Sequence, residues 1–173
     1  IAKIARLGSE NVLALLSDST DSKTPGYSLS ESRIAETLDE IFQHTEGRLI
    51  IATFAALISR IQSVVAAAEK NGRKVAIDGY SMKTNVEIAK NLGYLKCNRN
   101  TLIPINKINE YPDTKVSILC TGAQGESNAV LMRIVNGEHR FVKVHKADTF
   151  VLSSSVIPGN ERTVQSIMDT IYR

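Results

Sequence analysis

The sequence predicts an α/β fold with a mostly parallel sheet and helices on both of its faces. Short runs rich in Val, Ile and Leu alternate along the chain with longer stretches in which apolar residues recur every three or four positions. The first pattern is typical of strands that are buried on both faces, and the second is typical of amphipathic helices. Alternation of the two implies right-handed crossovers that connect parallel strands.

Short apolar runs mark the predicted strands. They are residues 12–16, 49–53, 75–77, 116–121 and 150–153. A further run at residues 141–144 is bordered and interrupted by basic side chains, which favours a place at the edge of the sheet.

Helices are predicted between the strands. Residues 28–31 read Ser-Leu-Ser-Glu, a pattern typical of a capping box, and apolar residues then recur at helical spacing as far as Phe42. Other predicted helices run from residue 58 to the Asn-Gly pair at 71–72 and over residues 81–92, 127–135 and 160–171. Glycines and asparagines stand where these helices should stop.

Composition is that of an ordinary globular protein. The chain has 173 residues, of which 43% are hydrophobic and 23% charged, and its net charge is +3. No apolar run approaches the ~20 residues that a membrane helix needs, so a soluble, cytoplasmic protein is expected. Cys97 and Cys120 lie too far apart in sequence to indicate a disulfide framework or a zinc knuckle. The chain starts at Ile1 and stops directly after a helical pattern, which suggests a piece of a longer protein.

Polar turns follow the predicted strands. Where each strand passes into the next helix, Ser, Thr, Gly, Asn and Gln dominate, at residues 18–20, 53–60, 79–82, 121–126 and 153–160. Small side chains let backbone N–H groups approach an anion, and the carboxyl ends of parallel strands meet at one edge of a sheet. The set therefore predicts a site for a phosphorylated polymer or a nucleotide.

Simpler explanations apply to each turn alone. Ser, Thr, Asp and Asn are the usual helix N-caps, and only the gathering of all the turns on one edge favours a site. Neither a G-x-G-x-x-G nor a Walker lysine motif is present, and the isolated His44, His139 and His145 form no metal-binding motif. The basic residues at 70, 73 and 74 are expected to be a solvated surface.

Several runs together resemble the signature runs of the ribonuclease J family, in order and over nearly the whole chain. They are residues 15–20 (LLSDST), 52–54 (ATF) with 59–62 (SRIQ), 72–75 (GRKV), 81–82 (SM), 121–126 (TGAQGE) and 153–161 (SSSVIPGNE). The resemblance implies that residues 1–20 are the tail of a metallo-β-lactamase-like domain and that residues 21–173 are a β-CASP domain, which is Rossmann-like and inserted into the first domain to clamp RNA.

The resemblance also implies roles for single residues. Asp18 matches the acidic ligand of a pair of zinc ions in the intact enzyme, and Glu31 matches the acidic residue of the β-CASP signature, a candidate catalytic group. Substrate binding is implied for Ser59, Arg60, Ser81, Thr121, Gly122, Gln124, Gly125, Ser154 and Asn160. The expected substrate is single-stranded RNA, cut internally and from its 5′ end. The implied partners are the metallo-β-lactamase-like domain of the same parent chain and, in a homo-oligomer, further copies.

Departures from the family pattern leave two alternatives open. The histidine motifs that supply most of the zinc ligands are absent, so this chain alone is expected neither to bind zinc tightly nor to cut RNA. Residues 55–58 are apolar where many relatives have a polar residue or histidine, and Tyr80 stands where an Arg is common. The alternatives are a non-catalytic RNA-binding or oligomerisation module and a stand-alone nucleotide-binding α/β protein.

Overall fold

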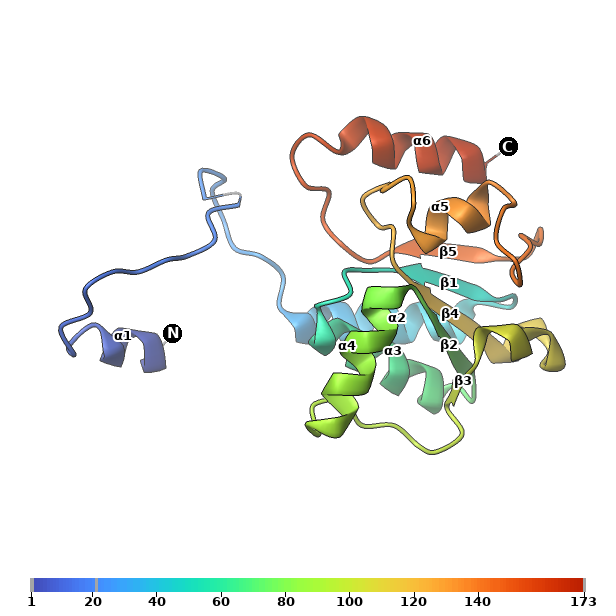
Figure 1. The fold of residues 1–173 in the computed structure, drawn as a ribbon, viewed down its shortest axis with the longest axis horizontal. Coiled ribbons are helices and arrows are strands. Elements are labelled where there is room, and N and C mark those ends of the chain that lie inside the picture. Colours follow the sequence, from blue (N-terminus) through green and yellow to red (C-terminus); the bar gives the residue numbers. More distant parts are fainter. Residues whose placement is uncertain (1, 21, 173) are drawn as a thin grey trace.

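A parallel sheet of five strands, in the order β3-β2-β4-β1-β5, forms the body of the molecule (Figure 1). The computed structural model describes residues 2–20 and 22–172. The strands are β1 (Leu49–Ala52), β2 (Lys74–Asp78), β3 (Leu102–Ile103), β4 (Val116–Cys120) and β5 (Thr149–Leu152). The predicted α/β fold class is therefore confirmed.

The helices from α2 to α6 lie in two layers, one on each face of the sheet, and α1 lies apart from them (Figure 1). They are α1 (Ala2–Leu7), α2 (Glu31–His44), α3 (Ile58–Lys70), α4 (Tyr80–Asn91), α5 (Val130–Val135) and α6 (Glu161–Ile171), with two 3-10 helices at Ile105–Glu110 and Asp113–Lys115. The N-cap of α2 is Ser30, whose hydroxyl accepts the backbone N–H of Arg33. The capping box predicted over residues 28–31 is therefore wrong in register, because the cap is the third of its four residues.

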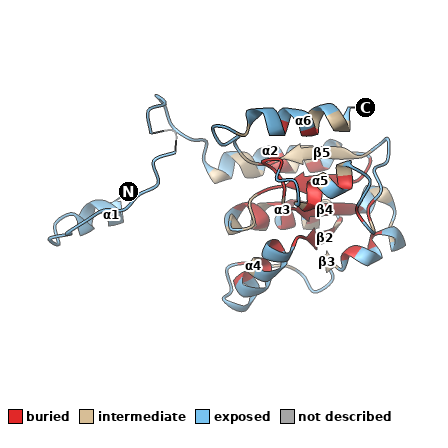
Figure 2. Ribbon diagram, turned by 45° about the horizontal axis from the view of Figure 1, so that its top comes forward, coloured by how far each residue is buried: buried red, intermediate tan, exposed pale blue. Residues whose placement is uncertain are grey.

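Alternate residues of each strand feed two separate cores. In β1, Leu49 and Ile51 pack with α2, α3 and α4, whereas Ile50 and Ala52 pack with α5, α6 and the 3-10 helix at Ile105–Glu110. Figure 2 shows the buried strands between helices whose outer faces are exposed. A strand buried on both faces is mostly apolar, which explains the short apolar runs in the sequence.

Successive strands are added first toward one side of the sheet and then toward the other. From β1 the chain moves through α3 and α4 to β2 and β3 on one side, and it returns to β4 and β5 through elements on the other face. β1 and β4 are neighbours, but the helices that follow them cover opposite faces. The turns after these two strands therefore lead to opposite faces of the sheet, and a crevice can open between them.

Two predicted strands are wrong. Residues 12–16 are exposed and belong to no sheet within residues 2–20 and 22–172, because no other segment pairs with their backbone. Residues 141–144 form a loop, in which the backbone N–H groups of Phe141 and Val142 bond to Nδ1 of His139 rather than to a strand. The edge position is taken instead by β3, which is too short to give a sequence signal.

The N-terminal segment extends away from the body. Residues 2–20 and 22–30 are exposed, and in Figure 1 they lead from α1 to the start of α2 at the side where the strands end. Large apolar side chains are among them, including Ile4, Leu13 and Leu16. In the described part of the chain, every helix is too short or too polar to cross a membrane.

The prediction that residues 70, 73 and 74 form a solvated surface is wrong for Arg73. Arg73 is buried, and its guanidinium donates hydrogen bonds to the carbonyl oxygens of Gly47, at 2.7 Å, and Thr45. Burial lowers the pKa of Arg73 from its ordinary value. These bonds hold the turn before β1, so the residue is structural.

Candidate nucleic-acid interface

Polar turns meet at the carboxyl ends of the strands, as the sequence predicts. The turn after β1 and the turn after β5 touch directly, since the hydroxyl of Thr53 donates to the carbonyl oxygen of Ser153 at 3.0 Å. The turn after β2 touches the turn after β4, where a Cβ on Gly79 would lie 3.0 Å from Oγ1 of Thr121. The turns after the four longer strands therefore line one edge.

Arg60 joins Glu31, another predicted site residue, to Ser153 directly after β5. Its Nε and Nη2 donate to the two carboxylate oxygens of Glu31 at 3.0 and 2.8 Å, and its Nη1 donates to the carbonyl and hydroxyl of Ser153 at 2.9 and 2.8 Å. Arg60 is buried, whereas the Glu31 side chain is 42% exposed. The hydrogen bonds from Arg60 hold the pKa of Glu31 below its ordinary value, against a smaller effect of burial. The ion pair with Arg60 thus favours the carboxylate form of Glu31.

Gln124 ties the turn after β4 to the loop after β5. Its Nε2 donates to Ser154 Oγ at 3.0 Å and to Ser155 O at 2.8 Å. Its Oε1 accepts the backbone N–H of Ile157 at 2.8 Å and Nδ2 of Asn160 at 3.4 Å. Gln124 is buried, so its amide is committed to these partners. Three predicted binding residues, Gln124, Ser154 and Asn160, therefore act as one hydrogen-bonded unit.

At two of the predicted binding positions, only glycine fits both the backbone conformation and the space between the turn and the helices. Gly122 and Gly125 have positive φ angles of 114° and 78°, which L side chains rarely adopt. A Cβ on Gly125 would lie 2.5 Å from Cγ2 of Thr163 in α6, and one on Gly122 would lie 2.8 Å from Cβ of Leu131 in α5. Both glycines bring the turn into contact with the helices behind it.

A carboxylate cluster that sequence reasoning missed lies beside these turns. Asp78, the last residue of β2, binds Nζ of Lys83 through Oδ1 and Nε2 of His139 through Oδ2, the latter at 2.8 Å. Nδ1 of His139 accepts backbone N–H groups, so Nε2 carries the proton in this bond. The sequence feature that could have indicated this cluster is the acidic residue directly before Gly79. His139 lies too far away in sequence to be connected with it.

Opposing effects act on Asp78. Burial raises the pKa of its carboxyl, but the bonds from Lys83, His139 and the Gly79 backbone outweigh it and hold the pKa below its ordinary value of 3.8. Burial, with the nearby charge of Asp78, raises the pKa of the Cys120 thiol. Cys120 is therefore an inert core residue, in keeping with its fully buried strand.

Asp18 lies in the exposed N-terminal segment, next to this edge. Its Oδ1 accepts the backbone N–H of Thr20 at 2.6 Å, and this bond lowers the pKa of the carboxyl. A cleft of about 540 Å³ is lined by residues of the segment and of the turns after β1 and β5: Asp18, Thr20, Ser28, Phe54, Ser155, Val156 and Ile157. The predicted metal ligand and the loop that Gln124 fixes thus face one space.

A complete zinc site does not fit the residues present. Among residues 2–20 and 22–172, no three His, Cys, Asp or Glu side chains come close enough to hold one ion. His139 is committed to Asp78, and Nδ1 of His145 lies 2.8 Å from Asp113 at the opposite edge of the sheet. The chain offers Asp18 as a single carboxylate, whereas a catalytic zinc needs about three protein ligands.

Three further predicted binding residues lie at this edge but outside the hydrogen-bonded clusters. Ser59 and Ser81 are exposed on the first turns of α3 and α4. Thr121 accepts the backbone N–H of Leu131 through its carbonyl at 3.0 Å, which fixes the start of α5. These three residues lie on the same edge without joining the clusters of Arg60 and Gln124.

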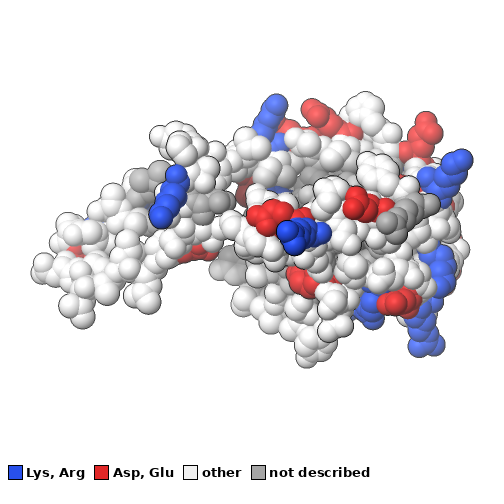
Figure 3. All heavy atoms as spheres, turned by 90° about the horizontal axis from the view of Figure 1, so that it is seen from above, with Lys and Arg blue, Asp and Glu red and all other residues white. Residues whose placement is uncertain are grey.

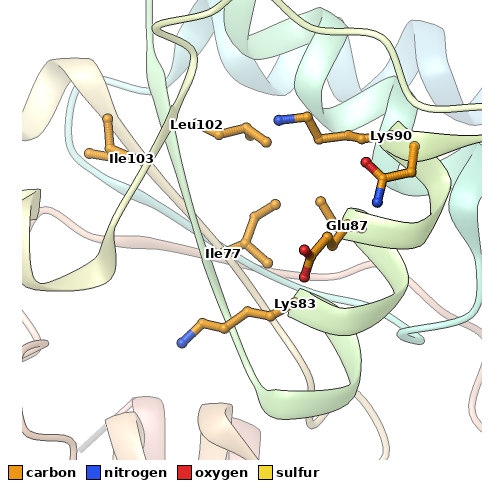
Figure 4. Close-up of a pocket in the computed structure, with 8 residues that line it drawn as sticks. Ile77, Lys83, Glu87, Lys90, Leu102 and Ile103 are labelled. Atoms are coloured by element: carbon orange, nitrogen blue, oxygen red, sulfur yellow. The ribbon is translucent and has the colours of Figure 1, made fainter. Parts of the chain in front are cut away.

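A second cavity lies between α4 and the strands β2 and β3. It has a volume of about 400 Å³, and Figure 4 shows Lys83, Glu87 and Lys90 of α4 facing Leu102 and Ile103 of β3 across it. None of the predicted site residues lines it. Lys83 and Lys90 line the cavity together with Glu87, and Lys83 is bound to Asp78. The cavity therefore has little net positive charge with which to bind an anion.

The fold and the edge together define the class of the protein. A parallel sheet covered by helices on both faces, with polar turns at the carboxyl ends of its strands, is an α/β domain of the kind in which ligands bind at that edge. The chain belongs to the ribonuclease J family: residues 46–171 match the family model described as "Ribonuclease J, beta-CASP domain". The match begins at residue 46, so the predicted domain boundary after residue 20 stays a prediction.

Curated relatives support the same assignment. The chain is 44% identical to ribonuclease J of Thermus thermophilus over 172 residues, 41% identical to ribonuclease J of Synechocystis over 171 residues, and 37% identical to ribonuclease J2 of Bacillus subtilis over 173 residues. Each alignment covers 99–100% of this chain but only 27–31% of the relative. The chain thus spans less than a third of the length of these proteins.

Proposed function

We propose that this chain is the RNA-holding domain of a zinc-dependent ribonuclease and that it binds single-stranded RNA along the carboxyl-end edge. One observation carries the proposal most strongly. Gln124 fixes the loop at residues 153–160 against the turn at residues 121–126, beside the cleft that Asp18 lines. The names of the relatives, all ribonucleases, support the choice of RNA as ligand.

Hydroxyls and backbone groups would make the contacts. Ser155 is exposed in the cleft, and Ser59 and Ser81 are exposed on adjacent first turns. Donors of this kind suit phosphate and ribose oxygens, which are the same for every nucleotide, so little sequence preference is expected. Arg60 and Gln124, which are buried, would position the turns rather than touch the RNA.

The intact protein would need more than this chain. We propose that the zinc ligands other than Asp18 come from a metallo-β-lactamase-like domain outside it, which the length of the relatives allows. Bound zinc would supply the activated water for hydrolysis. Endonuclease and 5′-exonuclease action, assembly into a homo-oligomer and a cytoplasmic location belong to the same proposal.

Titration of the chain with a single-stranded RNA of about ten nucleotides, followed by amide NMR, tests the proposal. Shifts should map to residues 121–126 and 153–160, and Gln124→Ala should weaken binding at least about five-fold because the loop loses its anchor. Gln43→Ala is the matched control, since Gln43 is exposed on α2 and bonds only to Asp39 there.

Two results would count against it. Shifts confined to the amino-end edge of the sheet would contradict the proposed binding edge. Tighter binding of a mononucleotide than of the RNA would favour the alternative of a stand-alone nucleotide-binding protein.

A further inference from the structure

One aromatic ring stands exposed on the candidate edge. Tyr80 is the first residue of α4, directly after Gly79 at the end of β2, and it is 89% exposed. No hydrogen bond to its hydroxyl is found among the described residues. We propose that Tyr80 is a platform on which a nucleobase of the bound single strand stacks; the inference rests on the proposed function and adds a binding residue to it.

The cations in the turns of this edge are already paired. In the turns at residues 53–60, 78–83, 121–126 and 153–160, the cations are Arg60 and Lys83 and the anions are Asp78 and Glu126. Arg60 is buried against Glu31, and Lys83 is bound to Asp78. On the face that Figure 3 shows, several Lys and Arg side chains gather at the end away from the N-terminal segment, and thus away from this edge.

Binding energy at this edge must therefore come largely from uncharged contacts. Ionic contacts to phosphates supply much of the affinity of most RNA-binding surfaces, and paired cations contribute little of it. Stacking on an aromatic ring is the other main source of affinity for single strands, and it works for every base because every base has a π face. Tyr80 is the exposed aromatic residue of these turns, since Phe54 is half-buried.

The backbone below the ring is fixed. Gly79 has a φ of 107° and packs against Thr121, and the carbonyl of Tyr80 accepts the hydroxyl of Thr84 at 3.0 Å. Asp78 is held by His139. A ring with two free torsions on such a support loses little conformational entropy when a base stacks on it.

The experiment compares tyrosines of equal exposure at opposite edges. Tyr172 is 90% exposed and lines a pocket with Asp148 and Thr149, at the amino end of β5. The affinity of the 173-residue chain for oligo(A) is measured with Tyr80→Ala, Tyr80→Phe and Tyr172→Ala, each at low and at high salt. An abasic ribose-phosphate oligomer of the same length is the second ligand.

Stacking predicts a specific pattern. Tyr80→Ala should weaken oligo(A) binding about ten-fold, by the same factor at both salt concentrations, while Tyr80→Phe and Tyr172→Ala bind like the unaltered chain. The abasic oligomer should bind all the variants equally weakly, and the ring protons of Tyr80 should shift upfield only with oligo(A). Unchanged thermal unfolding of Tyr80→Ala would show that the fold is intact.

The inference and the proposed function fail differently. Oligo(A) binding that Tyr80→Ala leaves unchanged, or an equal loss on the abasic oligomer, would overturn the stacking role and leave the RNA edge standing. No binding of either oligomer by the unaltered chain would overturn both.

Discussion

At the scale of single residues, the candidate edge depends on buried polar groups that are fully paired. Arg60 gives four hydrogen bonds to Glu31 and Ser153, and so it connects the start of α2 to the end of β5. A buried cation is stable only with such partners, and each hydrogen bond to a charged group contributes more than a neutral one.

Replacing Arg60 by Ala is therefore expected to lower the free energy of unfolding by about 1–3 kcal/mol. The buried hydroxyl of Ser153 loses its partner, whereas Glu31 is partly exposed and water can replace the guanidinium there. Arg33→Ala is the control, because the Arg33–Glu36 pair is exposed on both sides, at 69% and 61%. That variant should change the free energy by less than about 0.5 kcal/mol in urea unfolding. Equal effects of the two substitutions would contradict the role of burial.

The carboxyl of Asp78 makes stability depend on pH. Its pKa in the folded chain lies below the ordinary value of 3.8, so its stabilising effect is complete above that pH and is lost as the pH falls through the folded-state pKa. Asp78→Asn should be less stable than the unaltered chain at pH 7 and should lose less stability on acidification below pH 4. Urea unfolding across this range measures both. Lys83→Met, which removes one partner, should also reduce the acid slope.

At the scale of elements, close packing at the turns fixes where helices dock. Gly125 lies against Thr163, so the turn after β4 and the first turns of α6 can approach only when no side chain separates them. Gly137 provides a natural comparison, since its φ of 74° is nearly that of Gly125 but nothing lies within 4 Å of an added Cβ.

Gly125→Ala is expected to cost about 2–4 kcal/mol of folding free energy, because backbone strain of about 1–2 kcal/mol adds to the overlap with Thr163. Gly137→Ala should cost only the strain, about 1–2 kcal/mol. Chemical unfolding of the two variants compares them directly. If both lost the same amount, the contact with α6 would not be tight.

At the scale of the whole molecule, the body and the N-terminal segment differ in burial. Both cores of the sheet are formed by residues from Leu38 to Ile167, whereas residues 2–20 are exposed throughout. A part without buried apolar surface contributes little to stability. The body is therefore expected to fold cooperatively by itself.

Deletion of residues 1–20 should consequently move the thermal midpoint by less than about 2 °C and keep a single cooperative transition. Calorimetry of the full and shortened chains tests this and, with it, the predicted domain boundary. A shortened chain with native helix content but no cooperative transition would show that the segment completes the fold.

Catalysis is expected to need residues outside this chain. Because Asp18 is the single predicted zinc ligand in this chain, the metal-free protein should show no rise in thermal midpoint on addition of zinc or manganese and no cleavage of 5′-monophosphorylated RNA. Turnover that survives repurification and disappears in Asp18→Ala would overturn this expectation.

The sequence by itself determined the fold class, most elements and the edge at which the polar turns meet. Periodicity did this because strands buried on both faces are necessarily apolar, and polar turns after parallel strands necessarily meet at one edge. The same local reasoning failed at residues 12–16 and 141–144, where strand-like side chains lack a partner strand. Local reasoning also failed to predict β3, because a strand of two residues is too short to form a recognisable pattern.

Tertiary structure alone decided which side chains meet. Arg60 and Glu31 are 29 positions apart, Gln124 and Asn160 are 36 apart, and Asp78 and His139 are 61 apart. No periodic pattern connects such residues, since their contacts depend on strand order and on how helices dock. Only the folded chain therefore shows that the edge is held by paired charges and that Tyr80 stays uncovered upon it. Residue types are local properties that the sequence carries, whereas pairing and exposure arise only when distant segments pack together.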